Sequence, residues 1–152
     1  MFKSFTLLIF IFTLTFKVWA SYDVNNSYPD PKLEPNDVVR LQLLAMQQND
    51  DSDIGIEVTF RFASPANKKL TGPLNRFIRL VRNPSYRPLL NHINATFLDL
   101  NLEDNFAVQD VIITSSSGER IGYRFRLSIQ KDRLHQGCWM TDSVTPFKVM
   151  EV

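Results

Sequence analysis

Apolar and polar side chains alternate without a break between residues 121 and 130. The apolar positions are Ile121, Tyr123, Phe125, Leu127 and Ile129. Successive side chains of a strand point to opposite faces, so this pattern predicts an antiparallel strand with one buried face and one wet face. The second half of the chain is therefore expected to be β-structure.

Three other stretches of this half have the composition of strands. They cover residues 94–102, 106–114 and 138–144, and they are rich in β-branched, aromatic and aliphatic residues. Turn sequences separate them, the clearest being the Ser-Ser-Ser-Gly run at 115–118. Four strands in succession predict an antiparallel meander.

The first half has helical periodicity instead. Residues 36–49 carry an apolar stripe with Gln42 off it, and Asn36 is the expected N-cap. Residues 73–82 carry a clean stripe of Leu74, Phe77, Ile78 and Val81. Helices followed by a meander predict an α+β domain with the helices on one face of a bent sheet.

Residues 54–62 fit two periods at once. Apolar residues at every second position favour a strand, and local propensity supports that reading. However, Ile54, Val58 and Phe62 are also spaced by four, which permits a helix. The pattern alone leaves both alternatives open.

The first 20 residues are typical of a secretory signal peptide. Lys3 supplies the positive start, an uncharged and mostly apolar run follows at 4–16, and Ala20 precedes the expected cleavage site. We expect a protein exported to the periplasm or secreted. An uncleaved N-terminal anchor is the alternative, and it would be the only expected contact with a membrane.

The rest of the chain predicts one domain. Residues 21–35 are rich in Pro and Asn and are expected to be a flexible linker, residues 36–146 form the domain, and residues 147–152 are a tail. A length of 152 residues agrees with a single domain. The net charge of +1 gives no field that would attract nucleic acid.

Several separated motifs occur in a familiar order. They are FASPAN at 62–67, TGP at 71–73, RF at 76–77, VRNP at 81–84, Tyr86, PLLNH at 88–92 and GCWMTD at 137–142. With them the chain resembles the domain-of-unknown-function 4864 family from about Pro35 to Val144. The resemblance implies a nuclear transport factor 2-like cone of about three N-terminal helices on a curved four-stranded antiparallel sheet. It also implies a helix over 54–62, but no activity.

Cones of this class often enclose an apolar pocket with a few polar groups. Asp142 is the best candidate acid or base, provided that the strand face it shares with Met140 lines the interior; otherwise it faces solvent. Tyr86 and Trp139 are candidate pocket walls beside Asp142, although aromatic residues also fill cores.

Two further residues are candidates for catalysis. His92 could be a general acid or base, or it could hydrogen-bond a loop. Cys138 could be a nucleophile if a neighbour lowered its pKa, a redox-active or intermolecularly paired thiol, or a small buried hydrophobe. With one Cys and two His in the chain and no HxH or HxxxH spacing, we expect neither a metal nor a cofactor.

We expect a non-catalytic exported module that binds a small apolar ligand or a protein partner. One alternative is a pocket enzyme of the isomerase, dehydratase or hydrolase kind, which would need Asp142 and His92 in one cavity. Another alternative is a structural homodimer paired through the sheet face or a sheet edge.

Overall fold

Four antiparallel strands pair in the order in which they occur in the chain. In the computed structural model, which describes residues 23–150, they are β1 (Asn94–Glu103), β2 (Phe106–Thr114), β3 (Arg120–Ile129) and β4 (Trp139–Lys148). The expected α+β class and meander are confirmed. The expected signal peptide, residues 1–20, and its cleavage site lie outside the described residues.

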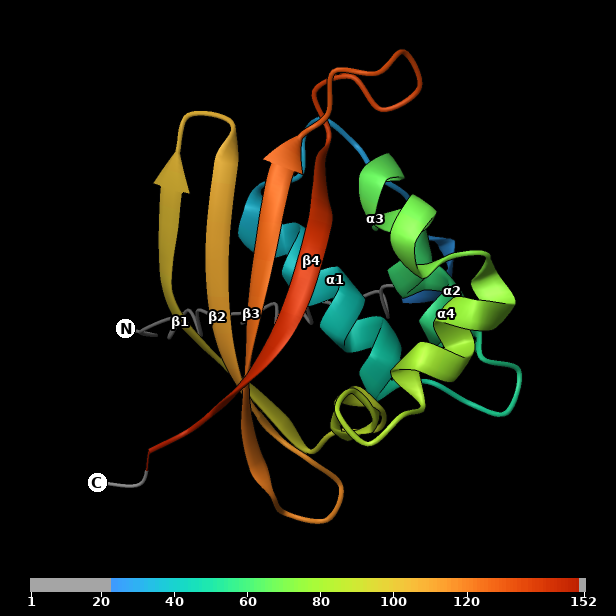
Figure 1. Cartoon of the computed structure of the whole chain (residues 1–152), viewed down its shortest axis with the longest axis vertical. Helices are drawn as coiled ribbons and strands as arrows, with labels where there is room; N and C mark the ends of the chain where they lie inside the picture. Colours follow the sequence, from blue (N-terminus) through green and yellow to red (C-terminus); the bar gives the residue numbers. More distant parts are fainter. Residues whose placement is uncertain (1–22, 151–152) are drawn as a thin grey trace, which may run out of the picture.

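The helix-facing side of the sheet forms the core. Tyr123, Phe125 and Leu127 of β3 are buried, as the alternation predicts. The opposite face is polar: Arg124 is exposed and forms a two-pronged ion pair with Asp110 of β2, with N···O distances of 2.7 and 2.8 Å. Figure 1 shows the curvature of the sheet and the helices gathered on one side of it.

Four α-helices cover the sheet. They are α1 (Pro35–Gln47), α2 (Ile54–Arg61), α3 (Pro65–Thr71) and α4 (Leu74–Val81), with short 3-10 helices at Val24–Asn26 and Arg87–Leu89. The expected number of about three is one too low because α3 has only seven residues, too few for a periodic stripe. The Ser64 hydroxyl caps α3 by accepting the Asn67 backbone N–H at 3.2 Å.

The helical alternative for residues 54–62 is confirmed. Ile56 and Val58 of α2 are fully buried. The apolar residues at every second position, which resemble a strand pattern, therefore lie on several sides of a helix that packs among other helices. The backbones of α1 and α2 approach closely at Gly55, where a Cβ atom would lie 2.1 Å from the Ala45 oxygen. This contact explains a glycine at the second position of α2.

The start of α1 differs from the expectation. Asn36 is not the N-cap: Glu34 is, and Pro35 holds the first helical position, where a missing N–H costs no hydrogen bond. Asp37 accepts the Glu34 backbone N–H at 3.1 Å and closes a capping box. The helix therefore starts one residue before the expected range 36–49 and ends two residues before its close.

The described part of the expected linker, residues 23–35, packs on the domain. Val24 lies in the core with 1% of its surface exposed. Arg61 of α2 donates to the Asn25 carbonyl at 2.7 Å, and its guanidinium lies 4.7 Å from the Tyr28 ring centroid. The described part of this segment is therefore an arm that contacts α2 and the core.

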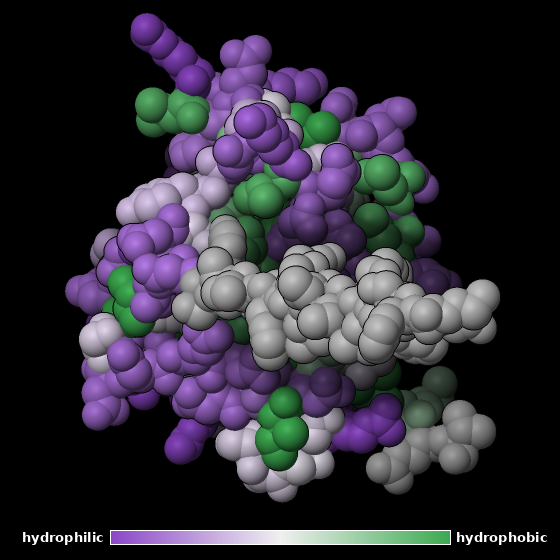
Figure 2. Space-filling view, turned by 180° about the vertical axis from the view of Figure 1, so that it is seen from behind, coloured by the Kyte–Doolittle hydropathy of each residue, from purple (hydrophilic) through white to green (hydrophobic). Residues whose placement is uncertain are grey.

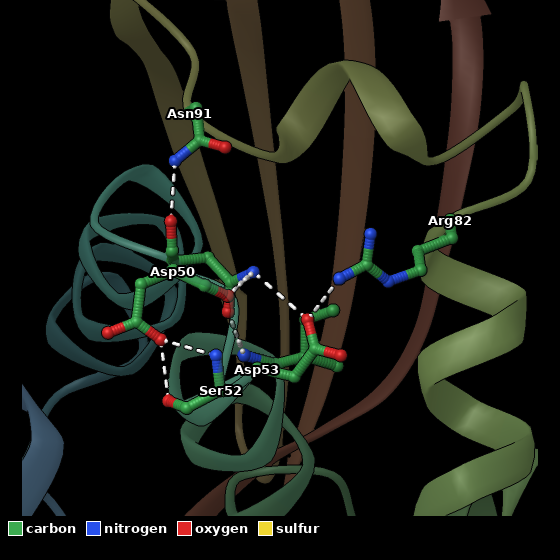
Figure 3. A network of polar contacts seen from close by, with 7 residues as sticks. Asp50, Ser52, Asp53, Arg82 and Asn91 are labelled. Atoms are coloured by element: carbon green, nitrogen blue, oxygen red, sulfur yellow. Dashed lines mark hydrogen bonds and ion pairs between the residues drawn. The ribbon is translucent and has the colours of Figure 1, made fainter.

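A polar network fixes the loop between α1 and α2 (Figure 3). The Asp53 carboxylate pairs with Arg82 at the end of α4 and accepts the Asn49 side-chain N–H at 3.2 Å. Asn91, just before β1, donates to the Gln47 and Asn49 carbonyls at 3.2 and 2.7 Å. The loop therefore ties together the ends of α1 and α4 and the approach to β1.

The edge strand β4 contains an irregularity. Leu127 of β3 pairs with Thr141, whereas the preceding Arg126 pairs with Ser143, so Asp142 is the extra residue of a β-bulge. The strand also continues to Lys148, beyond the expected end at 144 and into the expected tail. Pro146 is compatible with this longer strand because N–H groups on the outer side of an edge strand have no partner strand to donate to.

Candidate functional site

A pocket of about 300 Å³ lies between β4 and the helices. Its walls are mostly apolar and include Met46, Phe77, Leu80, Val81, Leu89 and Phe125. The volume is at the lower end of the range for small-molecule sites, which are typically apolar with a few placed polar groups. The space could therefore hold a compact ligand.

The floor of the pocket is a network of buried polar side chains. The Thr141 hydroxyl donates to Gln42 Oε1 at 2.7 Å, and Gln42 Nε2 donates to the Thr59 carbonyl at 3.1 Å. Asn67 Nδ2 donates to the Thr141 carbonyl at 3.0 Å. No buried side-chain nitrogen or oxygen of residues 23–150 lacks a hydrogen-bond partner. The network is satisfied within the protein and fixes three helices to β4.

The connection between α2 and α3 is joined to β4 by its backbone. Thr141 N–H donates to the Phe62 carbonyl, and Ser64 N–H donates to the Thr141 carbonyl, both at 2.9 Å. These bonds form a parallel bridge between Ala63 and Thr141. Two of the sequence motifs, at 62–67 and 137–142, therefore meet at the pocket.

Asp142 lines the pocket directly after this bridge and is half-buried. Within the described chain its carboxylate has no hydrogen bond or ion pair. The expected shared face with Met140 depended on regular alternation, which the bulge interrupts. Asp142 therefore reaches the pocket through an irregularity that the local sequence pattern does not reveal.

Tyr86 also lines the pocket. Its hydroxyl donates to the Val144 carbonyl of β4 at 3.0 Å, and its ring centroid lies 6.5 Å from that of Tyr123. Tyr123 is buried, which raises the pKa of its phenol, and it donates to the Ser85 carbonyl at 2.8 Å. Tyr86 thus connects the segment after α4 to the edge strand.

Trp139 and His92 are buried away from the pocket lining. Trp139 belongs to the hydrophobic core. His92 Nδ1–H donates to the Leu89 carbonyl at 2.8 Å, and burial lowers the pKa of the imidazole. His92 and Asp142 therefore do not meet in this pocket.

Cys138 is also buried outside the pocket lining. Burial raises the pKa of its thiol, and the carboxylates of Asp30 and Asp132 raise it further. A nucleophilic cysteine needs the opposite shift, because the thiolate is the reactive form. The surroundings of Cys138 therefore favour the protonated thiol.

The polar floor is the part of the site that sequence reasoning missed. Gln42 lies off the expected apolar stripe and yet is only 2% exposed. Its burial depends on Thr141, which is 99 positions away. The sequence feature that could have indicated this network is the FASPAN motif. It contains Asn67, which would otherwise be expected to be an ordinary surface residue of a short helix.

Most large apolar side chains that remain exposed lie outside the pocket. Those on β1 and at the start of β2 are Leu98, Leu100, Leu102 and Phe106. In Figure 2, hydrophilic residues make up much of the visible described surface, and hydrophobic residues appear in small separate groups. The same stretch of β1 also carries acidic residues, Asp99 and Glu103, so this surface is of mixed character.

Among residues 23–150, no group of three or more His, Cys, Asp or Glu side chains is placed to hold a metal ion. No helix within residues 23–150 has the length and apolar composition to cross a membrane.

One family model matches the chain over residues 30–149, and its description is "Domain of unknown function (DUF4864)". No curated protein matches the chain. No solved structure matches it either.

Proposed function

The chain belongs to the DUF4864 family, and we propose that it is a non-catalytic protein that binds a small, largely apolar ligand in the pocket beside β4. The observation that carries the proposal is the pocket itself, an apolar-walled space of about 300 Å³ between β4 and the helices. Buried apolar surface would supply most of the binding free energy, and the polar floor would orient the ligand.

The arrangement of titratable groups supports binding over catalysis. Asp142 and Tyr86 are the titratable residues of the lining, and the Tyr86 hydroxyl already donates to the Val144 carbonyl. His92 is committed to the Leu89 carbonyl outside the pocket. The enzyme alternative needs Asp142 and a second acid or base within reach of one substrate atom, and this pocket offers no such pair among the described residues.

We infer further that the domain has the nuclear transport factor 2-like architecture. A curved four-stranded antiparallel sheet, helices on one side of it and a pocket between the layers all support that inference. An experimental structure that superposes on known cones, strand for strand, is the test.

We also propose that residues 1–20 direct export and are removed after Ala20, as the sequence pattern indicates. N-terminal sequencing of protein recovered from the exported fraction is then expected to begin at Ser21. Recovery of membrane-bound protein that retains its N-terminus would favour the anchor instead.

The homodimer alternative has weaker support. Exposed leucines on β1, an edge strand, favour a contact there. However, Asp99 and Glu103 lie on the same strand, and two copies paired through it would bring like charges together. Sedimentation velocity over a range of concentrations tests this alternative, and we expect a monomer.

Filling the pocket tests the binding proposal. We expect neutral fragments such as benzyl alcohol to shift amide NMR signals of pocket residues in the wild-type protein. Leu80→Trp places a large ring in the lining and is expected to abolish these shifts. Ile93→Trp adds the same ring at an exposed site outside the lining and is the matched control. Absence of pocket shifts in the folded wild-type protein, or equal shifts in Leu80→Trp, would contradict the proposal.

A further inference from the structure

The pocket lining has a single sign of charge. Asp142 is its one acidic residue, and no Lys, Arg or His of residues 23–150 lines the pocket. An anionic ligand would therefore meet a carboxylate and no compensating cation. A neutral ligand would leave the carboxylate uncompensated, whereas a cationic ligand would complement it.

The Asp142 carboxylate is available to a ligand. It is half-buried, and no hydrogen bond or ion pair within the described chain engages it. Asp110 of β2 differs, since Arg124 holds its carboxylate in a two-pronged ion pair. A carboxylate that loses water when a ligand enters needs donors from that ligand, because an unpaired buried charge is costly.

The position of Asp142 is fixed by its neighbours. Thr141 is held through both of its backbone polar groups and through its hydroxyl, by Phe62, Ser64 and Gln42. Asp142 follows Thr141 directly as the extra residue of the bulge, and it lines the pocket. A binding group attached to so constrained a residue loses little conformational freedom when a ligand is bound.

We infer, resting on the proposed function, that the ligand is a small apolar molecule carrying a protonated amine. The ammonium group donates to the Asp142 carboxylate, and the apolar body lies against side chains such as Phe77, Leu80 and Phe125. The charge-assisted hydrogen bond selects for the amine, while the apolar walls provide most of the affinity.

Three fragments that differ mainly in charge test the inference by amide NMR titration at pH 7. They are benzylamine, which is a cation, benzyl alcohol, which is neutral, and benzoate, which is an anion. We expect benzylamine to bind about fivefold more tightly than benzyl alcohol, since a partly exposed ion pair contributes up to about 1 kcal/mol. Benzoate is expected to bind more weakly than either.

Asp142→Asn removes the charge and keeps the shape. It is expected to eliminate the preference for benzylamine over benzyl alcohol. Asp99→Asn removes an acid on β1, outside the lining, and is the matched control that should keep the preference. Unchanged amide spectra of both free variants would establish that they fold.

The outcomes separate this inference from the proposed function. If benzyl alcohol binds the pocket as tightly as benzylamine, or if the preference survives in Asp142→Asn, the inference on ligand charge is overturned and the binding proposal stands. If no fragment shifts pocket signals in the folded wild-type protein, both are overturned.

Discussion

The Thr141 hydroxyl donates a 2.7 Å hydrogen bond to Gln42 Oε1, which joins the edge strand β4 to α1 across the floor of the pocket. The same Gln42 amide donates to the Thr59 carbonyl of α2. Gln42 and Thr141 are almost fully buried. One amide therefore connects three elements in a place where an unpaired polar group would be expensive.

Thr141→Val is expected to destabilise the domain by about 1–3 kcal/mol. Valine keeps the shape of threonine but removes the donor, which leaves Gln42 Oε1 buried and unpaired. Urea unfolding followed by circular dichroism measures the change, and the dependence of the unfolding free energy on urea should stay the same.

A double-mutant cycle isolates the bond itself. Gln42→Met combined with Thr141→Val replaces both partners by apolar groups, so we expect the pair to cost less than the sum of the single changes. Additive effects of the two substitutions would argue against a direct interaction between these residues.

Gly55→Ala is expected to destabilise the domain by about 2 kcal/mol or more, since overpacking a tight contact forces backbone shifts. The added Cβ would lie 2.1 Å from the Ala45 oxygen and push α1 and α2 apart. Gly118→Ala is the control: its Cβ would meet open space, and only its left-handed backbone (φ +87°) costs free energy, about 1 kcal/mol. Equal losses of stability in Gly55→Ala and Gly118→Ala, measured by thermal unfolding, would contradict the close contact between α1 and α2.

The parts of the fold that sequence predicted are those with long, regular patterns. The alternation at 121–130 identified β3, and the stripe at 73–82 identified α4. The α3 helix is too short to have a period, and a glutamate N-cap at Glu34 is an uncommon choice. These features depend on local hydrogen bonds that composition does not encode.

The site was harder to predict than the fold. Of the residues proposed for the pocket, Tyr86 and Asp142 line it, whereas Trp139 lies in the core. The regular alternation expected for this strand would put Trp139 and Asp142 on opposite faces, but Asp142 is the extra residue of a bulge and lines the pocket. A bulge is set by pairing with β3, so residues 138–144 alone could not reveal it.

The buried His92 predicts a loss of stability below neutral pH. Its pKa in the folded protein is lowered from the ordinary value of 6.5. As the pH falls, the unfolded chain therefore binds a proton at His92 before the folded protein does. The contribution of neutral His92 to the free energy of unfolding is complete above pH 6.5 and is lost as the pH drops from there toward the lowered pKa. Unfolding free energies measured by urea at pH 7.5 and pH 5.5 test this expectation.

His92→Asn provides the control, because its side-chain N–H can replace Nδ1–H as donor to the Leu89 carbonyl. This variant should be less sensitive to pH in the same window. The lowered pKa of Asp110 affects stability in a more acidic range. The contribution of that carboxylate to the free energy of unfolding is lost only below its ordinary pKa of 3.8. An unchanged pH dependence in His92→Asn would refute the assignment to His92.

Cys138 is expected to react slowly with thiol reagents in the folded protein. The side chain is buried, and its raised pKa leaves little thiolate at pH 7.5. Iodoacetamide labelling followed by mass spectrometry should be more than about tenfold slower in native buffer than in 8 M urea, where exposure restores an ordinary pKa near 8.5. Because Cys138 is the chain's single cysteine, the labelled site needs no further assignment. Equal labelling rates in the two solutions would reject a structural role and reopen the nucleophile alternative.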